Sequence, residues 1–294
     1  MTHAPALVDI QWEGQRIALE YQWLGACAGE TPKTAEAAEA AEAGRAGRVG
    51  APALPLVIFL HEGLGSLAMW KDFPQQLCAA ARCRGLVISR PGYGQSTPLP
   101  AGTRWNSDFL ERQALEVLPA ALAALGVDAS AQPLWLLGHS DGASIALIYA
   151  AAFPAQVAGL VVLAPHCFVE DQTVASIAAL QVPDVRSALL ARLARYHRAP
   201  APVFDAWSSI WLDGAFRHWT IADRMRRIGC PVLAVQGLDD EYGSLEQIRS
   251  IARAVSGTRL LELATCGHSP HRDQPQALIA AFGSFLNHKE GDNP

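Results

Sequence analysis

The sequence LWLLGHSDGA, from Leu134 to Ala143, indicates the fold most directly. It begins as an apolar strand, continues with the pattern G-x-S-x-G, and leads into a stretch with helical character. In the sharp turn that joins such a strand to such a helix, small residues let the two chains pack closely. The hydroxyl of the central Ser140 then projects from the top of the sheet. Between a buried strand and a helix, this pattern predicts a nucleophilic serine.

Apolar strands and helices alternate outward from this stretch in both directions. A hairpin of residues 7–12 and 16–23 is expected first. The expected strands that follow are 56–60, 85–89, 133–137, 157–163, 231–236 and 258–263, and the expected helices are 70–82, 108–125, 141–152, 244–255 and 275–287. Continuous apolar strands separated by helices are typical of a mostly parallel sheet that helices cover on both faces. The sequence therefore predicts an α/β fold.

Two segments depart from this alternation. Residues 166–228 contain no strand-like run, and their apolar residues follow helical spacing. We expect a helical cap there, inserted between two strands of a core that comprises residues 1–165 and 229–294. Residues 27–53, rich in Ala, Glu and Gly, lack an apolar face and are expected to form a flexible insertion.

The composition excludes several classes of protein. Half of the 294 residues are hydrophobic and 17% are charged, whereas a wholly disordered chain needs low hydrophobicity and high charge. The formal charge of −5 argues against general nucleic-acid binding, which needs a basic surface. Six scattered cysteines form no C-x-x-C pair, which favours reduced, buried thiols.

The ends and apolar runs of the sequence complete this prediction. Residues 1–5 lack the features of a signal peptide, and the strongest apolar run, Leu54–Leu60, is too short to span a bilayer. We expect a cytoplasmic monomer or homodimer that acts on a small-molecule substrate. Neither nucleic acid nor a membrane is expected as a partner.

A serine hydroxyl needs a general base, and the base needs a carboxylate that orients it. Both are expected at the carboxyl ends of later strands, in the order serine, acid, histidine. The strand at 231–236 is followed by three acidic candidates, Asp239, Asp240 and Glu241. The strand at 258–263 is followed by His268, which is the candidate base.

The loop HEGLGS, from His61 to Ser66, follows the first buried strand and is rich in glycine. Such a loop can direct a backbone N–H towards an oxyanion, and the amide of Asp141, directly after the serine, supplies a second donor. An oxyanion hole is therefore expected beside Ser140.

Several of these motifs resemble those of the α/β-hydrolases, in particular cap-bearing, carboxylesterase-like members. The resemblance extends from Leu54 to the C-terminus and rests on the segments HEGLGS (61–66), RPGYGQS (90–96), GHSDG (138–142), GLDD (237–240) and GH (267–268). It implies that Ser140 is the nucleophile, His268 the base and Asp240 the acid. It also implies oxyanion donors at Asp141 and at Gly63 or Leu64, and no metal or cofactor.

One residue departs from the family pattern, because the usual His-Gly pair of the oxyanion loop is His61-Glu62 here. Glu62 and Asp141 are either ordinary loop and helix-cap residues or acidic groups that disfavour anionic substrates. Substrate-pocket candidates are Glu62, His139, His166, Trp207 and Trp211. The two tryptophans either pack the cap onto the sheet or line a ligand cleft.

These features favour a serine hydrolase that cleaves a small carboxylic ester, thioester or lactone through an acyl-enzyme. A C–C bond hydrolase or a cofactor-free haloperoxidase would use the same three residues. A more distant alternative is an NADP-dependent reductase, since residues 63–68 match G-x-G-x-x-A and Arg90 ends the next strand. A second distant alternative is a protein that binds a ligand but has no catalytic activity. The pair His268 and His271 is not expected to bind a metal, because Pro270 lies between them and no carboxylate-rich helix is near.

Overall fold

The computed structural model describes residues 3–25 and 54–291, so the insertion predicted at 27–53 lies outside the described residues. The described strands form one sheet in the order β1-β2-β4-β3-β5-β6-β7-β8. Their bounds are β1 (Ala6–Trp12), β2 (Gln15–Leu24), β3 (Leu56–Leu60), β4 (Arg84–Ile88), β5 (Leu134–His139), β6 (Val157–Leu163), β7 (Val232–Gly237) and β8 (Arg259–Leu263). All pairs from β4 to β8 are parallel, and β1 and β2 add an antiparallel hairpin at one edge. The predicted α/β fold and its hairpin are confirmed.

The solid apolar pattern of the strands has a simple cause, which is that both faces of the sheet are covered. In β3, Ile58 belongs to the core on one face and Phe59 to the core on the other. In β5, Leu136 and Trp135 divide in the same way, because successive side chains of a strand point to opposite faces.

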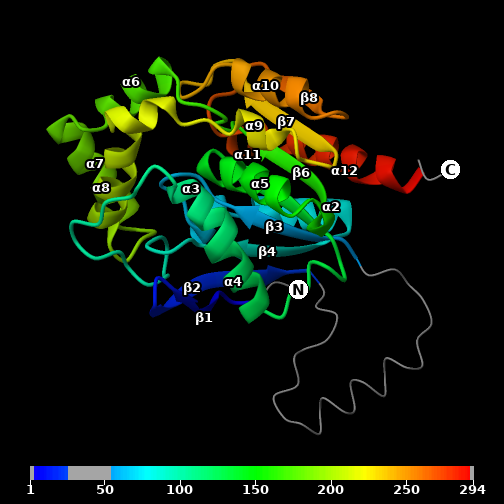
Figure 1. Cartoon of the computed structure of the whole chain (residues 1–294), viewed down its shortest axis with the longest axis horizontal. Helices are drawn as coiled ribbons and strands as arrows, with labels where there is room; N and C mark the ends of the chain where they lie inside the picture. The colour runs from blue at the N-terminus through cyan, green and yellow to red at the C-terminus, as the bar shows by residue number, and fades with distance from the viewer. Residues whose placement is uncertain (1–2, 26–53, 292–294) are drawn as a thin grey trace, which may run out of the picture.

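Helices cover both faces (Figure 1). The helices of the first face include α3 (Phe109–Arg112), α4 (Leu118–Ala124), α5 (Asp141–Ala152) and α10 (Glu246–Ala254), and those of the second face include α2 (Phe73–Ala81) and α12 (Pro275–Gly291).

Two predicted helices differ in detail from the structure, since one begins later and the other contains a π-helical segment. The stretch 70–82 divides into η1 (Leu67–Trp70), a 3-10 turn, and α2, because Lys71 takes a positive φ of 53° and ends the turn. The predicted helix 108–125 is present as one continuous helical run of α3, a π-helical segment η2 (Gln113–Val117) and α4. Pro119 has no N–H to donate to the preceding turn, which fits the π-helical hydrogen bonding directly before it.

The stretch between β6 and β7 is helical and comprises α6 (Asp171–Ala179), α7 (Pro183–Leu193), α8 (Pro200–Trp211), η4 (Gly214–His218) and α9 (Ala222–Met225). Its two ends lie side by side, because Phe168 and Thr220 form an antiparallel bridge and Ile221 N donates to Cys167 O at 2.9 Å. Helices α6 to α8 lie beyond one end of the sheet (Figure 1). A separate cap unit with bounds 166–228 stays a prediction.

Across residues 3–25 and 54–291, no single helix is long and apolar enough to cross a membrane. Helices α6 and α7 satisfy length and composition only when they are taken together, and they are bent by 84° relative to each other.

The contact of β5 with α12 provides a test of the core on the second face. Trp135 is 5% exposed and meets Phe282 and Phe285 edge-on, with ring centroids 6.1 and 5.6 Å away. Trp135→Ala is expected to lower the free energy of unfolding by about 3–5 kcal/mol, because it removes a large side chain and leaves a cavity. Urea denaturation measures this loss. Val185→Ala, at a side chain 42% exposed, is the control and should change stability by less than about 0.5 kcal/mol.

Candidate active site

Ser140 occupies the turn between β5 and α5 and has a φ of 52°, which is unusual for a residue with a side chain. The two glycines around it are required by close packing. A Cβ on Gly138 would lie 2.2 Å from the carbonyl oxygen of Gly142, and one on Gly142 would lie 2.0 Å from that of Leu60. Ser140 N donates to Leu163 O at 2.9 Å, which ties the turn to the neighbouring strand β6.

Three side chains from the ends of separate strands form a hydrogen-bonded chain. His268 Nε2 lies 3.0 Å from Ser140 Oγ, and His268 Nδ1 lies 2.9 Å from Asp240 Oδ1. Because a carboxylate only accepts, Nδ1 is the protonated ring nitrogen and Nε2 accepts from the hydroxyl. This is the geometry that a serine nucleophile, its general base and an orienting acid require.

Burial separates the three acidic candidates after β7. Asp240 is 7% exposed, whereas Asp239 and Glu241 are exposed. Burial acts to raise the pKa of the Asp240 carboxyl, but the hydrogen bond and charge of His268 and the Tyr242 N–H outweigh it, so this pKa lies below its usual range. Glu241 instead accepts the backbone N–H of His268 at 3.2 Å.

Two further histidines lie close to these residues. The His166 ring is 5.7 Å from that of His268, and the His271 ring is 4.8 Å from that of His139. Burial, with a smaller contribution from the neighbouring histidines, lowers the pKa of His166 to about 3 and that of His271 to about 3. Both rings are therefore neutral near pH 7.

Glu62 and His139 contact each other beside Ser140. His139 Nδ1 is 3.4 Å from Glu62 Oε2, and His139 Nε2 donates to the carbonyl oxygen of His268 at 2.7 Å. Burial acts to raise the pKa of Glu62, but the hydrogen bond and charge of His139 dominate and hold it well below its usual range. Glu62 thus supports the backbone of the candidate base through His139.

The two tryptophans of α8 occupy different positions. A Cβ on Gly63 would lie 2.1 Å from Trp207 Nε1, so the indole packs directly on the loop after β3. This nitrogen is buried and has no hydrogen-bond partner among the described residues. Trp211 is 1% exposed and contacts the His166 ring at 5.0 Å, which places it one layer behind the candidate base. Trp207 therefore lies on the loop after β3, and Trp211 packs against the rings of His166 and Phe216.

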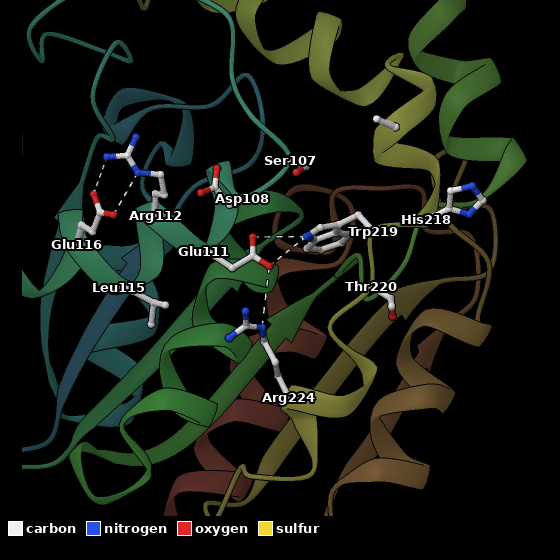
Figure 2. Close-up of a pocket in the computed structure, with 11 residues that line it drawn as sticks. Ser107, Asp108, Glu111, Arg112, Leu115, Glu116, His218, Trp219, Thr220 and Arg224 are labelled. Atoms are coloured by element: carbon white, nitrogen blue, oxygen red, sulfur yellow. Dashed lines mark hydrogen bonds and ion pairs between the residues drawn. The ribbon is translucent and has the colours of Figure 1, made fainter. Parts of the chain in front are cut away.

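A pocket of about 590 Å³ lies apart from these residues, between the α3–η2 segment and the segment from Ala215 to Arg224 (Figure 2). Its charged side chains contact one another. The Glu111 carboxylate accepts from Trp219 Nε1 at 3.3 Å and lies 4.0 Å from Arg224 Nε, while Arg112 pairs with Glu116 at 2.8 Å. The residues that line this pocket include none of the candidate site residues.

Comparison with known proteins agrees with this geometry. Residues 57–281 match the family described as the Alpha/beta hydrolase family. The chain belongs to this family. A curated relative, 2-succinyl-6-hydroxy-2,4-cyclohexadiene-1-carboxylate synthase of Klebsiella pneumoniae (strain 342), is 27% identical over 259 residues, which are 79% of this chain and 94% of the relative.

Solved structures of other alpha/beta hydrolases share the fold. A thermophilic esterase from Thermogutta terrifontis matches with a TM-score of 0.65 at 17% identity, covering 97% of this chain and 99% of the esterase. The enol-lactonase from Burkholderia xenovorans LB400 matches with a TM-score of 0.65 at 19% identity, covering 97% and 100%. At these identities the likeness shows the fold alone.

Some residues near the site of this alpha/beta hydrolase were not expected from the sequence. The Tyr242 ring lies 4.8 Å from that of His268. His197, between α7 and α8, donates from Nε2 to Leu64 O at 3.0 Å and accepts the Gly94 N–H at 2.9 Å. Neither residue lies in a recognisable motif. Arg90 belongs to the motif RPGYGQS, so the sequence indicated that it lies near the site. Its contacts with Glu62 O and Asp141 were not indicated by any motif.

The neutral buried histidines predict how stability depends on pH. An unfolded histidine has a pKa of about 6.5. With folded values near 3, the unfolded chain binds protons first as the pH falls, so stability is lost on acidification from pH 6.5. Each such histidine contributes a slope of up to about 1.4 kcal/mol per pH unit.

His271→Gln is expected to make this loss between pH 6.5 and 4 shallower, as measured by urea unfolding at several pH values. Trp135→Ala is the matched control, since it changes no titratable group and should lower stability equally at each pH. A slope in His271→Gln as steep as in the wild type would contradict the expectation.

Proposed function

We propose that this protein is a serine hydrolase that cleaves a small carboxylic ester, thioester or lactone through an acyl-enzyme. The hydrogen-bonded chain from Ser140 through His268 to Asp240, with contacts of 3.0 and 2.9 Å, is the observation that carries the proposal. Membership of the alpha/beta hydrolase family supports it.

The first half of the proposed reaction acylates the serine. Ser140 Oγ attacks the carbonyl carbon of the substrate while its proton passes to His268 Nε2. Asp240 holds the ring and stabilises the imidazolium that forms. The carbonyl π electrons move to oxygen, and the amides of Asp141 and of Gly63 or Leu64 receive the resulting oxyanion. When the intermediate collapses, the bond to the leaving group breaks and His268 returns the proton to it.

The second half hydrolyses the acyl-enzyme. Water gives a proton to His268 Nε2 and adds to the acyl carbon, which forms a second oxyanion at the same amides. Its collapse releases the carboxylic acid, and His268 returns the proton to Ser140 Oγ. Because Ser140 is 6% exposed, a compact acyl group fits the proposal best.

The curated relative suggests a second candidate. It is named a synthase, and its similarity extends over most of both chains. The same three residues would then serve a synthase reaction in place of hydrolysis. Arg90, the arginine in contact with Asp141, is buried and bound to the Glu62 carbonyl oxygen, so it offers no free positive charge to a substrate rich in carboxylates. We therefore prefer hydrolysis.

The reductase alternative has little support in the contacts of the loop after β3. The positions that a pyrophosphate would approach are filled, because Trp207 packs on Gly63 and a Cβ on Gly65 would lie 2.3 Å from Glu62 Oε2. As part of the same proposal, the protein acts in the cytoplasm on a small molecule, as a monomer or homodimer and without nucleic acid or a membrane.

Ser140→Ala tests the proposal. With a p-nitrophenyl ester, the wild type should show a burst of p-nitrophenol, and the variant should lose the burst and about 10⁴-fold in kcat. A fluorophosphonate should add one phosphonyl group to the wild type, by mass spectrometry, and none to the variant. The matched serine control is Ser250→Ala, on the distant helix α10, where the Ser250 hydroxyl donates to Gln247 O. This variant should keep full activity.

The proposal fails if Ser140→Ala retains activity within tenfold of the wild type. It also fails if the wild type accepts none of an ester, thioester and lactone panel while the fluorophosphonate leaves Ser140 unmodified.

A further inference from the structure

Arg90 is the buried cation nearest the candidate oxyanion hole. It lies two residues after the end of β4, and its side chain is 6% exposed. A buried guanidinium is costly unless its N–H groups and its charge are matched, so its contacts indicate what it does. Three contacts are present, to the Glu62 carbonyl oxygen, to the Asp141 carboxylate and to the face of Tyr93.

The first contact fixes the direction of a backbone amide. Arg90 Nη2 donates to Glu62 O at 2.8 Å. The carbonyl of Glu62 and the N–H of Gly63 belong to one planar peptide unit and point in opposite directions. A hydrogen bond that fixes the direction of the Glu62 carbonyl therefore also fixes the direction of the Gly63 N–H. The Gly63 N–H itself donates to no described residue.

Two further donors reinforce the same carbonyl oxygen, and one of them is the Gly65 N–H, at 3.1 Å. His61 Nδ1 donates to Glu62 O at 2.8 Å, while His61 Nε2 accepts the backbone N–H of Arg90 at 3.0 Å. Burial and the nearby Arg90 charge hold the pKa of His61 well below its usual value, so the ring stays neutral with one donor and one acceptor nitrogen. The peptide between Glu62 and Gly63 is therefore held by three donors, of which Arg90 is the one that also reaches Asp141.

The other contact reaches the second half of the hole. Arg90 Nη2 lies 3.6 Å from Asp141 Oδ2, and the Asp141 side chain is 1% exposed. Asp141 is the first residue of α5, so its own backbone N–H has no partner inside the helix. One nitrogen of Arg90 thus contacts both residues that flank the space in front of Ser140.

We infer that Arg90 is a positioning residue that aligns the two oxyanion donors, Gly63 N–H and Asp141 N–H. This inference rests on the proposed function. The donors come from different elements, the loop after β3 and the start of α5, and Arg90 joins them from a third, the end of β4. Its positive charge also polarises the peptide whose oxygen it binds, which makes the Gly63 N–H a stronger donor to a developing negative charge.

Arg90→Lys separates this role from simple packing. A lysine keeps the positive charge, but one ammonium group cannot reproduce the fixed fork of a guanidinium. We expect kcat for a p-nitrophenyl ester to fall about 10²-fold, as when one oxyanion donor is lost, with KM within about twofold of the wild type. The affinity for an aryl trifluoromethyl ketone, which forms a hemiketal oxyanion on Ser140, should fall by a similar factor.

The matched control is Arg84→Lys at the other end of β4. Arg84 donates to Gln132 at 3.2 Å and lies over the Trp23 ring, away from Ser140. It should keep kcat and inhibitor affinity within about twofold, because it touches neither donor. If Arg90→Lys does not fold, Asp141→Asn replaces it, because it keeps the size of the side chain and weakens the contact with Arg90 at 3.6 Å. That variant should lower kcat and inhibitor affinity together, about tenfold.

The inference is overturned if folded Arg90→Lys, or Asp141→Asn in its place, keeps both kcat and inhibitor affinity. It is also overturned if only KM changes, which indicates a role in substrate binding or packing. Whether the wild type hydrolyses the ester in a way that depends on Ser140 separates the two proposals. If it does not, both the proposed function and the role of Arg90 fail. If it does and Arg90→Lys is unchanged, only the role of Arg90 fails.

Discussion

The backbone of Ser140 has a φ of 52°, and such a conformation costs a residue with a side chain about 1–3 kcal/mol. The turn persists because β5 and α5 are fixed on either side of it and because Gly138 and Gly142 let the chains approach. The sheet that fixes them buries apolar side chains on both faces, and this burial offsets the strain. The Ser140 hydroxyl is therefore held towards His268, in the loop that follows β8.

Parallel strands bring the remaining site residues to the same edge of the sheet, because their carboxyl ends all meet there. The residues that follow β3 to β8 at this edge are Glu62, Arg90, Ser140, His166, Asp240 and His268. Each carboxylate of the group has a partner, since Glu62 contacts His139, Asp141 contacts Arg90 and Asp240 contacts His268. The local acidity that is visible in the sequence is thus largely matched by positive or hydrogen-bonding groups, and Glu62 and Asp141 act as structural partners in these contacts.

Local patterns in the sequence predicted the strands, the hairpin and the turn at Ser140, because each depends on neighbouring residues. They placed the start of the helix at 70–82 too early, since apolar spacing continues through Lys71, where a positive φ ends the preceding turn, and they did not predict the π-helical segment within 108–125. The three acidic residues after β7 were equivalent by spacing alone. Only burial and the direction of the side chain distinguish Asp240, and both depend on how the loop after β7 packs against that after β8.

The sequence by itself determined the α/β alternation, the strand–turn–helix around Ser140, the candidate base His268 and three acidic candidates that include Asp240, because periodicity and turn chemistry are local properties. Tertiary structure alone decided that Arg90 touches both Glu62 O and Asp141, that Trp207 covers Gly63, and that His166 is neutral. These contacts join residues far apart in the chain. Their distances and burial follow from the packing of the whole sheet and its helices, which no local pattern specifies.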